Sequence, residues 1–517
     1  MLDKLDHYDF SLLQENKRGI ERESLRVDRQ GGAVKSKHPE ALGEKLTNEF
    51  VTVDFSEELL ELITPPFASR SDCFEFLKAA TAYTQKALEK DEVMWSGSMP
   101  PPITEDDILI ADFGTNVSAK MKEVYRKGLA LRYGKKMQVI AGIHYNFSIS
   151  EPFLDSLEID EFSGSKQDRK SYLYFRLIKR YYQISWLLPY LFGCSPVCAK
   201  ASVIEKPDYL ANLDADHYFG EYATSLRMSD LGYQSKAQEN LFISCENVDE
   251  YVSDLLKATD TRYPDYIREG VKDDQGEYQQ LSDNILQIEN EYYNTIRPKQ
   301  IAKRCERPAC ALLKRGVEYV EVRLLDVDLF SEVGVAEDTG LFIEVFLMLC
   351  VLAPELKYNE HLVVESSDNF DKVVKYGRQP NLMLTRNKKE EKFQDWGKEL
   401  LEQCLPIAKK MDEGQKGNSK RYQSAVKIQM AKLVDVSLTP SARILTEAKE
   451  HGEGYHRWLS EMSEKYAESL SEYDIPADLK AEFDDKVAAS IEAWEILEQK
   501  DMGSFEYYIQ SYFQSKC

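Results

Sequence analysis

The sequence predicts an α+β fold in which helices pack against an antiparallel sheet. Residues 138–150 alternate apolar and polar side chains, the period of a strand with one face on a core and one face accessible. An antiparallel sheet fits this pattern better than a parallel sheet, which is buried on both faces. Strands and helices are intermixed over the first two thirds of the chain, and the last third is mostly helical. We therefore expect a mixed core over residues 1–335 and a mainly helical part over residues 336–517 packed on it.

The strand expected at residues 138–150 (QVIAGIHYNFSIS) gathers hydrogen-bonding side chains on one face. Its odd positions carry Val, Ala, Ile, Tyr, Phe and Ile, which suit a core. Its even positions include Gln138, His144, Asn146 and Ser148. We expect this polar face to be the accessible one.

Acidic residues concentrate in two other segments near the N-terminus. In GIERESLRV, Glu21 and Glu23 share a strand face with apolar Leu and Val. Two more acids, Asp54 and Glu61, lie in DFSEELLELITPP, which ends in a proline pair. Burying an unpaired charge is very costly, so carboxylates on an apolar face need a metal ion or an arginine as a partner.

A third strand, VEYVEVRLL, places Glu321 and Arg323 on one face. Alone, this pair fits a structural ion pair as well as a functional one. Glu21 and Glu23, taken alone, more often mark a solvent-facing strand edge. His144, taken alone, is more often a histidine with its hydrogen bonds satisfied by the protein than a metal ligand. Together, the acids, the histidine and the arginine indicate oxygen-rich cation sites. Such sites suit Mg²⁺ or Mn²⁺, because zinc usually takes more nitrogen and sulfur ligands.

Several segments have a purely structural interpretation. Residues 340–352 are apolar on nearly every side and predict a buried helix. Residues 398–411 and 479–499 have helical apolar spacing with charged outer faces, typical of packing helices. Residues 366–371 (SSDNFD) and 413–420 (EGQKGNSK) are polar and turn-rich, and we expect loops there.

Composition excludes several classes of protein. The 517 residues carry a formal net charge of −23, which argues against a nucleic-acid partner because phosphate binding needs clustered Lys and Arg. No apolar run approaches the roughly 20 residues of a membrane-spanning helix, and the N-terminus lacks a signal-peptide pattern, so we expect a cytoplasmic protein. The nine cysteines form no metal-binding motif or disulfide framework, and we expect them to be reduced.

Common nucleotide and hydrolase motifs are absent from the sequence. There is no GxxxxGK[ST] phosphate loop, no GxGxxG after a strand, no HExxH and no GxSxG. If the protein uses ATP, metal ions and arginines must hold the phosphates.

Ten ordered sequence blocks resemble those of one family, glutamate–cysteine ligase of the proteobacterial type. The blocks are KRGIERESLRV, HPEALG, VDFSEELLELITP, MWSGSMP, RYGKKMQVIAGIHYNFS, PYLFGCSP, YATSLRMSDLGY, LQIENEYYNTIRPK, RGVEYVEVRLLDVD and LTPSARIL. Nine of them lie between Lys17 and Phe330. Beyond residue 330 the resemblance is weak, and only Arg443, in the last block, is carried over as a possible site residue.

The resemblance implies a glutamine-synthetase-like core, in which a curved antiparallel sheet forms a funnel with helices on its outer face. It also implies an ATP-dependent ligase. Such an enzyme phosphorylates the γ-carboxylate of L-glutamate, and the amine of L-cysteine then displaces phosphate. The products are γ-glutamylcysteine, ADP and phosphate, the first step of glutathione biosynthesis. The polar strand face at residues 138–150 would line the funnel.

The resemblance further implies a set of site residues. Divalent cations must neutralise the triphosphate and the carboxylate before these anions can approach each other. The implied metal ligands are Glu21, Glu23, Asp54, Glu61, His144 and Glu321. Arg323 would stabilise the transferring phosphoryl group, and Arg227 would bind a substrate carboxylate or the acyl phosphate. The implied substrate-binding residues are Phe55, Tyr125, Arg126, Gln138, Asn146, Tyr233, Tyr293 and Arg297.

Two alternatives remain open from the sequence. The ligase could use an amine acceptor other than cysteine, or the chain could be an inactive relative that binds metal or glutamate. The presence of all the acids with His144 and Arg323 argues against the inactive relative. The resemblance predicts a monomer. The sequence identifies neither the base that deprotonates the amine nor any inhibition by glutathione.

Overall fold

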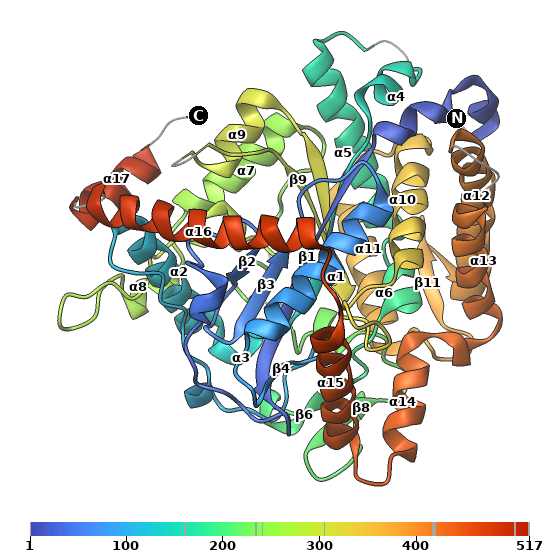
Figure 1. Cartoon of the computed structure of the whole chain (residues 1–517). Helices are drawn as coiled ribbons and strands as arrows, with labels where there is room; N and C mark the ends of the chain where they lie inside the picture. Colours follow the sequence, from blue (N-terminus) through green and yellow to red (C-terminus); the bar gives the residue numbers. More distant parts are fainter. Residues whose placement is uncertain are drawn as a thin grey trace.

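The computed structural model describes residues 2–159, 162–232, 235–239, 241–303, 306–415, 420–500, 503–514 and 517, and an open antiparallel sheet lies at its centre (Figure 1). The strand order is β2-β3-β1-β5-β10-β9, and β4 pairs with the far end of β1. The strands of this sheet are β1 (Lys17–Asp28), β2 (Val51–Val53), β3 (Leu59–Ile63), β4 (Glu92–Met94), β5 (Gly142–Ser148), β9 (Ile296–Lys299) and β10 (Tyr319–Asp326).

Two small antiparallel sheets lie apart from the main one. The first has the order β6-β8-β7, and the second is the hairpin β11-β12. Their bounds are β6 (Val197–Ala199), β7 (Leu210–Asn212), β8 (His217–Gly220), β11 (Met383–Arg386) and β12 (Lys389–Lys392).

Helices form the rest of the regular structure. Those before residue 336 are α1 (Arg70–Ala87), α2 (Val117–Tyr133), α3 (Lys135–Gln138), α4 (Glu151–Ser156), α5 (Lys166–Ile184), α6 (Leu187–Phe192), α7 (Val248–Asp260), α8 (Pro264–Glu269) and α9 (Pro308–Arg315). Those after it are α10 (Glu337–Leu352), α11 (Glu360–Tyr376), α12 (Phe393–Gly414), α13 (Arg421–Val434), α14 (Pro440–Glu450), α15 (Tyr455–Glu472), α16 (Ala477–Lys500) and α17 (Phe505–Gln514). Among the described residues, no helix is long and apolar enough to cross a membrane.

The two faces of the sheet differ as the alternation predicts. On β5, the side chains of Ile143, Tyr145 and Phe147 are fully buried and belong to the main core cluster. His144 and Asn146 alternate with them on the opposite face. The expected α+β fold, with one polar sheet face, is therefore confirmed.

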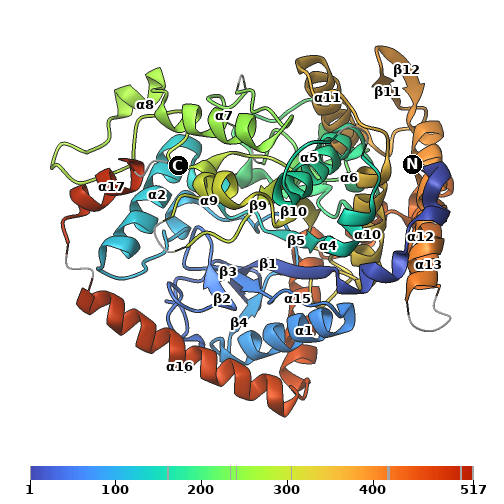
Figure 2. The same ribbon diagram turned by 90° about the horizontal axis from the view of Figure 1, so that it is seen from above.

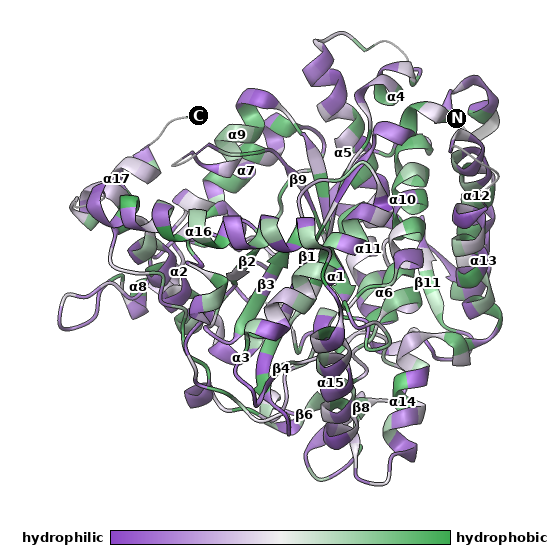
Figure 3. Cartoon of the chain, viewed as in Figure 1, coloured by the Kyte–Doolittle hydropathy of each residue, from purple (hydrophilic) through white to green (hydrophobic). Residues whose placement is uncertain are grey.

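Helix α10 lies on the apolar face of the sheet and is buried from Gly340 to Leu352, as predicted. Figure 3 shows it largely in hydrophobic colours, whereas α16 mixes both kinds of residue. One charged residue, Glu344, is fully buried on this helix. A charge in that position needs several partners.

Glu344 receives hydrogen bonds from four side chains of different elements. Arg18 Nε lies 3.0 Å from Oε1 and Arg70 Nη2 lies 2.6 Å from Oε2. The hydroxyls of Tyr145 and Tyr422 each donate at 2.9 Å. Burial opposes ionisation of Glu344, but the charges of Arg18 and Arg70 outweigh it and lower the pKa to about 2. This cluster links β1, β5, α1 and α13 to α10.

Helix α16 crosses the sheet edge and reaches the start of α2. Seen from above, it runs on the same side of the sheet as α1 (Figure 2). Phe483 stacks on Phe50 with ring centroids 4.8 Å apart. Near the other end of α16, Glu498 accepts hydrogen bonds from the backbone N–H of Thr115 and of Asn116, each at 3.1 Å. Asn116 is the N-cap of α2, so α16 holds that helix at its first turn.

Three local predictions were wrong in whole or in part. Residues 366–371 are not a loop but part of α11, where Asn369 pairs in both directions with the backbone of Thr385. The strand expected at residues 138–150 is shorter, because Gln138 ends the short helix α3 and β5 begins at Gly142. In the loop expected at 413–420, residues 413 and 414 belong to α12 and residues 416–419 lie outside the described part of the chain.

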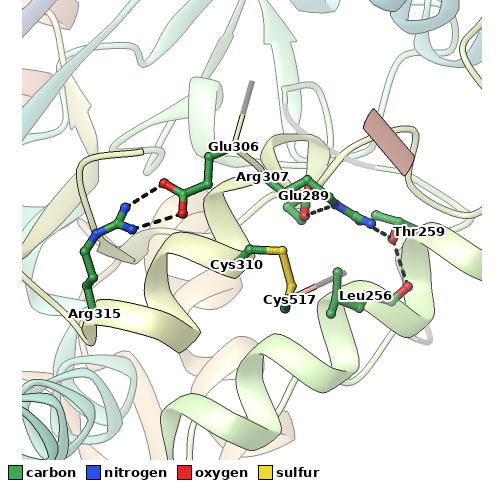
Figure 4. Close-up of a disulfide and its surroundings, with 8 residues drawn as sticks. All are labelled: Leu256, Thr259, Glu289, Glu306, Arg307, Cys310, Arg315 and Cys517. Carbon is green, nitrogen blue, oxygen red and sulfur yellow. Dashed lines mark hydrogen bonds and ion pairs between the residues drawn. A yellow bond between two sulfur atoms is a disulfide. The ribbon is translucent and has the colours of Figure 1, made fainter. Parts of the chain in front are cut away.

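The prediction that all cysteines are reduced was also wrong. Cys310 on α9 and Cys517 form a disulfide with their Cα atoms 4.7 Å apart (Figure 4). The two residues are 207 positions apart, so sequence spacing could not indicate the pair. Cys194 and Cys198 are free thiols, as expected, and both are buried; burial raises the pKa of Cys198 to about 12.

The disulfide predicts a specific labelling pattern. Alkylation of the unfolded, unreduced protein should leave Cys310 and Cys517 unlabelled, because a disulfide sulfur has no thiol to react. Peptide mass spectrometry measures the result, and a sample reduced before alkylation is the control. Labelling of both residues without reductant would contradict the bond.

The buried ion cluster predicts a large loss of stability in Glu344→Gln. Removing one charge from a buried pair leaves the arginines uncompensated, and we expect the free energy of unfolding to fall by about 3–5 kcal/mol. Chemical denaturation measures this value. Glu337→Gln on the same helix is the control, because its pair with Arg421 is surface-exposed and should change stability by less than about 1 kcal/mol.

Candidate active site

The register of the main sheet brings the predicted acidic residues to one place. Glu21 pairs with His144 across β1 and β5, and Glu23 pairs with Glu61 across β1 and β3. Glu321 on β10 stands opposite Asn146 on β5. These side chains therefore project side by side from the polar face of the sheet.

His144 lies at the centre of the cluster. Its Nδ1 is 3.0 Å from Glu21 Oε2 and 3.6 Å from Glu321 Oε1. Its Nε2 is 3.6 Å from Glu23 Oε1. Three carboxylates from two strands thus converge on one imidazole that is only 4% exposed.

The carboxyls in the cluster divide into two electrostatic classes. Burial opposes ionisation of Glu321, but Lys299, Arg323 and His144 outweigh it and hold its pKa well below the ordinary value. Burial and the charges of Glu21, Asp54 and Glu23 raise the pKa of Glu61 well above its ordinary value. Burial also raises the pKa of Glu23. The positive charge that the protein supplies near Glu23 and Glu61 therefore does not offset their burial and the repulsion from neighbouring acids.

A divalent cation fits this donor set. One ligand atom each from Glu21, Glu61 and His144 lie within 4.8 Å of one another. Asn146 donates to Glu21 Oε1 at 2.9 Å, while its own Oδ1 is buried and has no hydrogen-bond donor within the described chain. Carboxylate and amide oxygens with a single imidazole suit a hard cation such as Mg²⁺ or Mn²⁺.

Two cationic side chains face Glu321. Arg323, predicted from the sequence, donates to Oε1 at 2.8 Å. Lys299, which the sequence analysis missed, places its Nζ 3.2 Å from Oε2. Its period-2 spacing from Arg297 on the same strand was the available signal. The cluster therefore has a cationic side as well as an acidic side.

The guanidinium of Arg227 packs closely against Gly142, next to the cluster. The Arg227 side chain is 2% exposed, and Nη2 donates to the backbone carbonyl of Arg323 at 3.0 Å. A Cβ added to Gly142 would lie 2.0 Å from Nη2, so only glycine allows the guanidinium this close. The N–H of Gly142 donates to Glu23 Oε2 at 2.6 Å. One residue at the start of β5 thus positions both Arg227 and Glu23.

Asp326, at the end of β10, was also missed. It accepts hydrogen bonds from Ser195 Oγ at 2.7 Å and Ser225 Oγ at 2.9 Å, and lies 3.9 Å from Arg227 Nη1. Ser195 Oγ in turn accepts from the backbone N–H of Arg227 at 3.2 Å. A buried polar network therefore holds the loop that carries Arg227.

The predicted amino-acid-binding residues gather beside the acidic cluster. Arg126 donates through Nε to the backbone carbonyl of Asp54. Gln138 Nε2 donates to the hydroxyl of Tyr293 at 3.3 Å. Burial and the charges of Glu291 and Asp54 raise the pKa of Tyr125. Residues of α2, α3 and the segment before β9 thus form a second group next to the acidic cluster.

Arg297 makes mainly local contacts in the structure. Its Nε donates to Asn294 Oδ1 and its Nη2 to the carbonyls of Asn290 and Tyr292. It stands opposite Glu321 in the sheet register. It therefore shapes the turn before β9 at the edge of the cluster.

Three other predicted residues have different outcomes. Phe55 is 1% exposed and packs in the main core beside Asp54. Tyr233 lies outside the described residues. Arg443, on α14, is exposed and lies over the ring of Phe330 at 3.7 Å, where it lines a separate cavity of about 440 Å³. The structure does not bring Arg443 to the acidic cluster.

Two cavities are lined by predicted site residues or by residues next to them. One of about 310 Å³ includes Glu21 and Asn146 and has apolar walls from Ile63, Ile301 and Tyr319. The other, of about 780 Å³, is lined in part by Tyr133, Met137, Ile140 and Gly232 next to the amino-acid-binding group. Among the described residues, an acid of the cluster, Glu21, lines only the smaller of the two cavities.

Comparison with known families gives one clear match. Residues 2–373 match the family model of glutamate-cysteine ligase. A glutamate–cysteine ligase from Pseudomonas putida is 42% identical over 503 residues, covering 97% of this chain and 95% of that protein. One from Pseudomonas fluorescens is 42% identical over 98% of this chain and 94% of its own length.

Solved structures agree with this result. The glutamate–cysteine ligase of Francisella tularensis, in complex with AMP, matches with a TM-score of 0.92 and 47% identity, covering 97% of this chain and 98% of that one. A bifunctional glutathione synthetase from Pasteurella multocida matches with a TM-score of 0.72 at 23% identity, over 91% of this chain and 54% of that one. The second likeness concerns the fold alone.

The contact between Gly142 and Arg227 predicts the effect of Gly142→Ala. The added methyl group must displace the Arg227 guanidinium, and a shift of about 1 Å in a positioning group typically costs about 100-fold in kcat/KM. Steady-state kinetics measure the loss. Gly452→Ala is the control, since a Cβ there has no atom within 4 Å. Unchanged kinetics in Gly142→Ala would show that Arg227 does not need this position.

Proposed function

The chain belongs to the glutamate–cysteine ligase family, and we propose that the acidic cluster around His144 is where it joins the two amino acids. The enzyme links the γ-carboxylate of L-glutamate to the amine of L-cysteine with ATP. The products are γ-glutamylcysteine, ADP and phosphate, so it carries out the first step of glutathione biosynthesis. The observation that supports this site best is the convergence of three carboxylates on one buried imidazole beside Arg323.

In this proposal, Glu21, Glu23, Asp54, Glu61, His144 and Glu321 hold Mg²⁺ or Mn²⁺ ions. When bound, such ions neutralise the triphosphate and the γ-carboxylate so that the two anions can approach. The raised pKa of Glu23 and of Glu61 supports this role, because burial and neighbouring acids disfavour their charged forms and a bound cation would favour them.

The nucleotide is proposed to occupy the cavity of about 310 Å³ beside Glu21 and Asn146. Its apolar walls suit a flat base, and Glu21 and Asn146 also belong to the acidic cluster, where the phosphates would lie. Its volume is small for a whole nucleotide, so the triphosphate would extend out of it toward His144.

The proposed reaction has two steps, and Arg323 and Arg227 bind the phosphoryl group during them. A glutamate γ-carboxylate oxygen attacks the γ-phosphorus of ATP, and the bond to the ADP oxygen breaks to give γ-glutamyl phosphate. The planar fork of Arg323 matches the equatorial phosphate oxygens. The cysteine amine then attacks the acyl carbon, phosphate leaves with its oxygen, and the amine loses a proton. In this proposal, Arg227 binds the acyl phosphate.

The acceptor pocket is proposed to lie between α2 and the segment before β9. The substrate-binding residues of the whole proposal are Phe55, Tyr125, Arg126, Gln138, Asn146, Tyr233, Tyr293 and Arg297. Of these, Asn146 lies on β5 beside the cavity proposed for the nucleotide. The hydrogen bond between Gln138 and Tyr293 supports the acceptor pocket, because it joins two predicted residues that are distant in sequence.

The remaining expectations concern organisation. We propose a cytoplasmic monomer, in which residues 1–335 carry the catalytic core and residues 336–517 pack on it. The charge of −23 supports the monomer, since it makes copies repel each other. The helices α10 to α17 support the division at residue 335.

Release of ADP and phosphate tests the function. The purified protein is incubated with ATP, Mg²⁺ and glutamate, with and without cysteine. Release that requires both amino acids, together with a γ-glutamyl dipeptide, is expected. Release that is indifferent to cysteine would point to another amine acceptor, and no release in a folded sample would contradict the ligase.

The acidic cluster predicts that Glu23→Gln and Glu61→Gln lower turnover by at least about 100-fold and raise the Mg²⁺ concentration needed for half-maximal rate. Mg²⁺ titration of the rate measures both effects. Glu58→Gln is the matched control, because Glu58 is 3% exposed in the connection between β2 and β3 but lies outside the cluster. Retained turnover in a well-folded Glu23→Gln sample would remove that residue from the site.

A further inference from the structure

Glu291 is a buried carboxylate with an unusual number of partners. It is 1% exposed, and the side chains of Glu291 and Arg132 are both fully buried. Its Oε1 accepts from Arg132 Nη1 at 2.9 Å and from the Tyr133 hydroxyl at 2.6 Å. Its Oε2 accepts from the backbone N–H of Gln287 at 2.6 Å. Glu291 thus accepts from three protein donors, and it is not one of the acids grouped around His144.

The partners of Glu291 tie it to the helix that carries one wall of the acceptor pocket. Arg132 and Tyr133 end α2, the helix of Tyr125 and Arg126. Gln287, which also belongs to the Glu291 network, donates through Nε2 to the backbone carbonyl of Tyr125 at 3.2 Å. A Cβ on Gly128 of α2 would lie 2.2 Å from Gln287 Oε1, so this glycine allows the close packing.

Glu291 also belongs to the opposite wall. Tyr293 follows it by two residues, and Gln238 bridges the two by donating to the Glu291 carbonyl and accepting from the Tyr293 N–H, each at 3.0 Å. The rings of Tyr133 and Tyr293 meet edge to face with centroids 5.8 Å apart. The Glu291 carboxylate therefore fixes the distance between the two walls.

We propose that Glu291 is a positioning residue for the cysteine-binding pocket, acting through Tyr133, Gln287 and Tyr293. The inference rests on the proposed assignment of that pocket. A carboxylate is required because its two oxygens are acceptors only, and three donors point at them. In a glutamine, the amide nitrogen would face one of these donors, and α2 would shift relative to Tyr293.

The resulting defect should be selective for the acceptor. ATP is proposed to bind beside Glu21 and Asn146, and no contact of Glu291 reaches those residues among the described interactions. A change of the wall spacing should therefore weaken cysteine binding while ATP binding stays the same. A residue with a purely structural role would instead lower stability without this selectivity.

Steady-state kinetics of Glu291→Gln test the proposal at saturating glutamate. We expect the KM for cysteine to rise roughly tenfold or more, as for loss of a hydrogen bond to a charged group, with the KM for ATP within about twofold. Tyr133→Phe, which removes one donor and keeps the ring, should raise the KM for cysteine in the same direction by less. If Glu291→Gln does not fold, Tyr133→Phe decides the question by the same two constants.

Glu289→Gln is the matched control. Glu289 lies two residues away and is also buried, but it pairs with Arg307 at 2.8 Å on the side of α9 (Figure 4). The KM of the Glu289→Gln variant for cysteine should be unchanged. The proposal is overturned if Glu291→Gln leaves both constants unchanged or shifts them together, or if Glu289→Gln reproduces its effect.

A separate variant distinguishes this inference from the pocket assignment. Gln138→Ala removes a predicted pocket residue that has no hydrogen bond to Glu291 in the described structure. If Gln138→Ala raises the KM for cysteine and Glu291→Gln does not, the positioning role fails and the pocket stands. If neither variant changes it, the pocket assignment fails with the inference that rests on it.

Discussion

The crowding of carboxylates on one sheet face is the constraint on which the rest of the site depends. Glu21, Glu23 and Glu321 reach a single imidazole, and like charges at such distances repel strongly when buried. The backbone ladder of β1, β5 and β10 holds the side chains in place despite this repulsion. The protein compensates Glu321 with Lys299 and Arg323 but leaves Glu23 and Glu61 with raised pKa values. Incomplete compensation by the protein is what makes the cluster suited to bind cations.

The opposite face of the sheet is organised around a different charge. Glu344 is fully compensated by Arg18, Arg70 and two tyrosine hydroxyls, and its pKa is low. Glu344 thus contrasts with Glu23 and Glu61 on the polar face, whose pKa values are raised. The ion cluster around Glu344 stabilises the packing of α10 on the sheet. Around Glu23 and Glu61, the positive charge of the protein does not offset the burial of the carboxyls.

Helix α2 is the element through which distant parts of the chain reach the proposed pocket. Glu498 of α16 binds its first turn, and Glu291 binds its last residues. Ile509 of α17 packs with Val124 on its side, and Cys517, beyond that helix, is bonded to Cys310 of α9. The C-terminal helices, in which the sequence resemblance is weakest, therefore support the residues that the resemblance implies for amino-acid binding.

The sequence by itself determined which side chains share a face of each strand, because alternation is a local property of an extended backbone. It thereby grouped His144 with Asn146 and Glu321 with Arg323, and it predicted the buried helix α10. Only the tertiary structure decided which strands are neighbours, and so which acids meet. It also decided the outcome at Asn369, whose hydrogen bonds to Thr385 place a turn-rich segment in a helix, and at Cys310, whose partner is 207 residues away. Asp326, Gly142 and Glu291 were missed for the same reason: their contacts join segments far apart in the chain, and no local pattern records such contacts. Lys299 differs from them, because its period-2 spacing from Arg297 was a local signal.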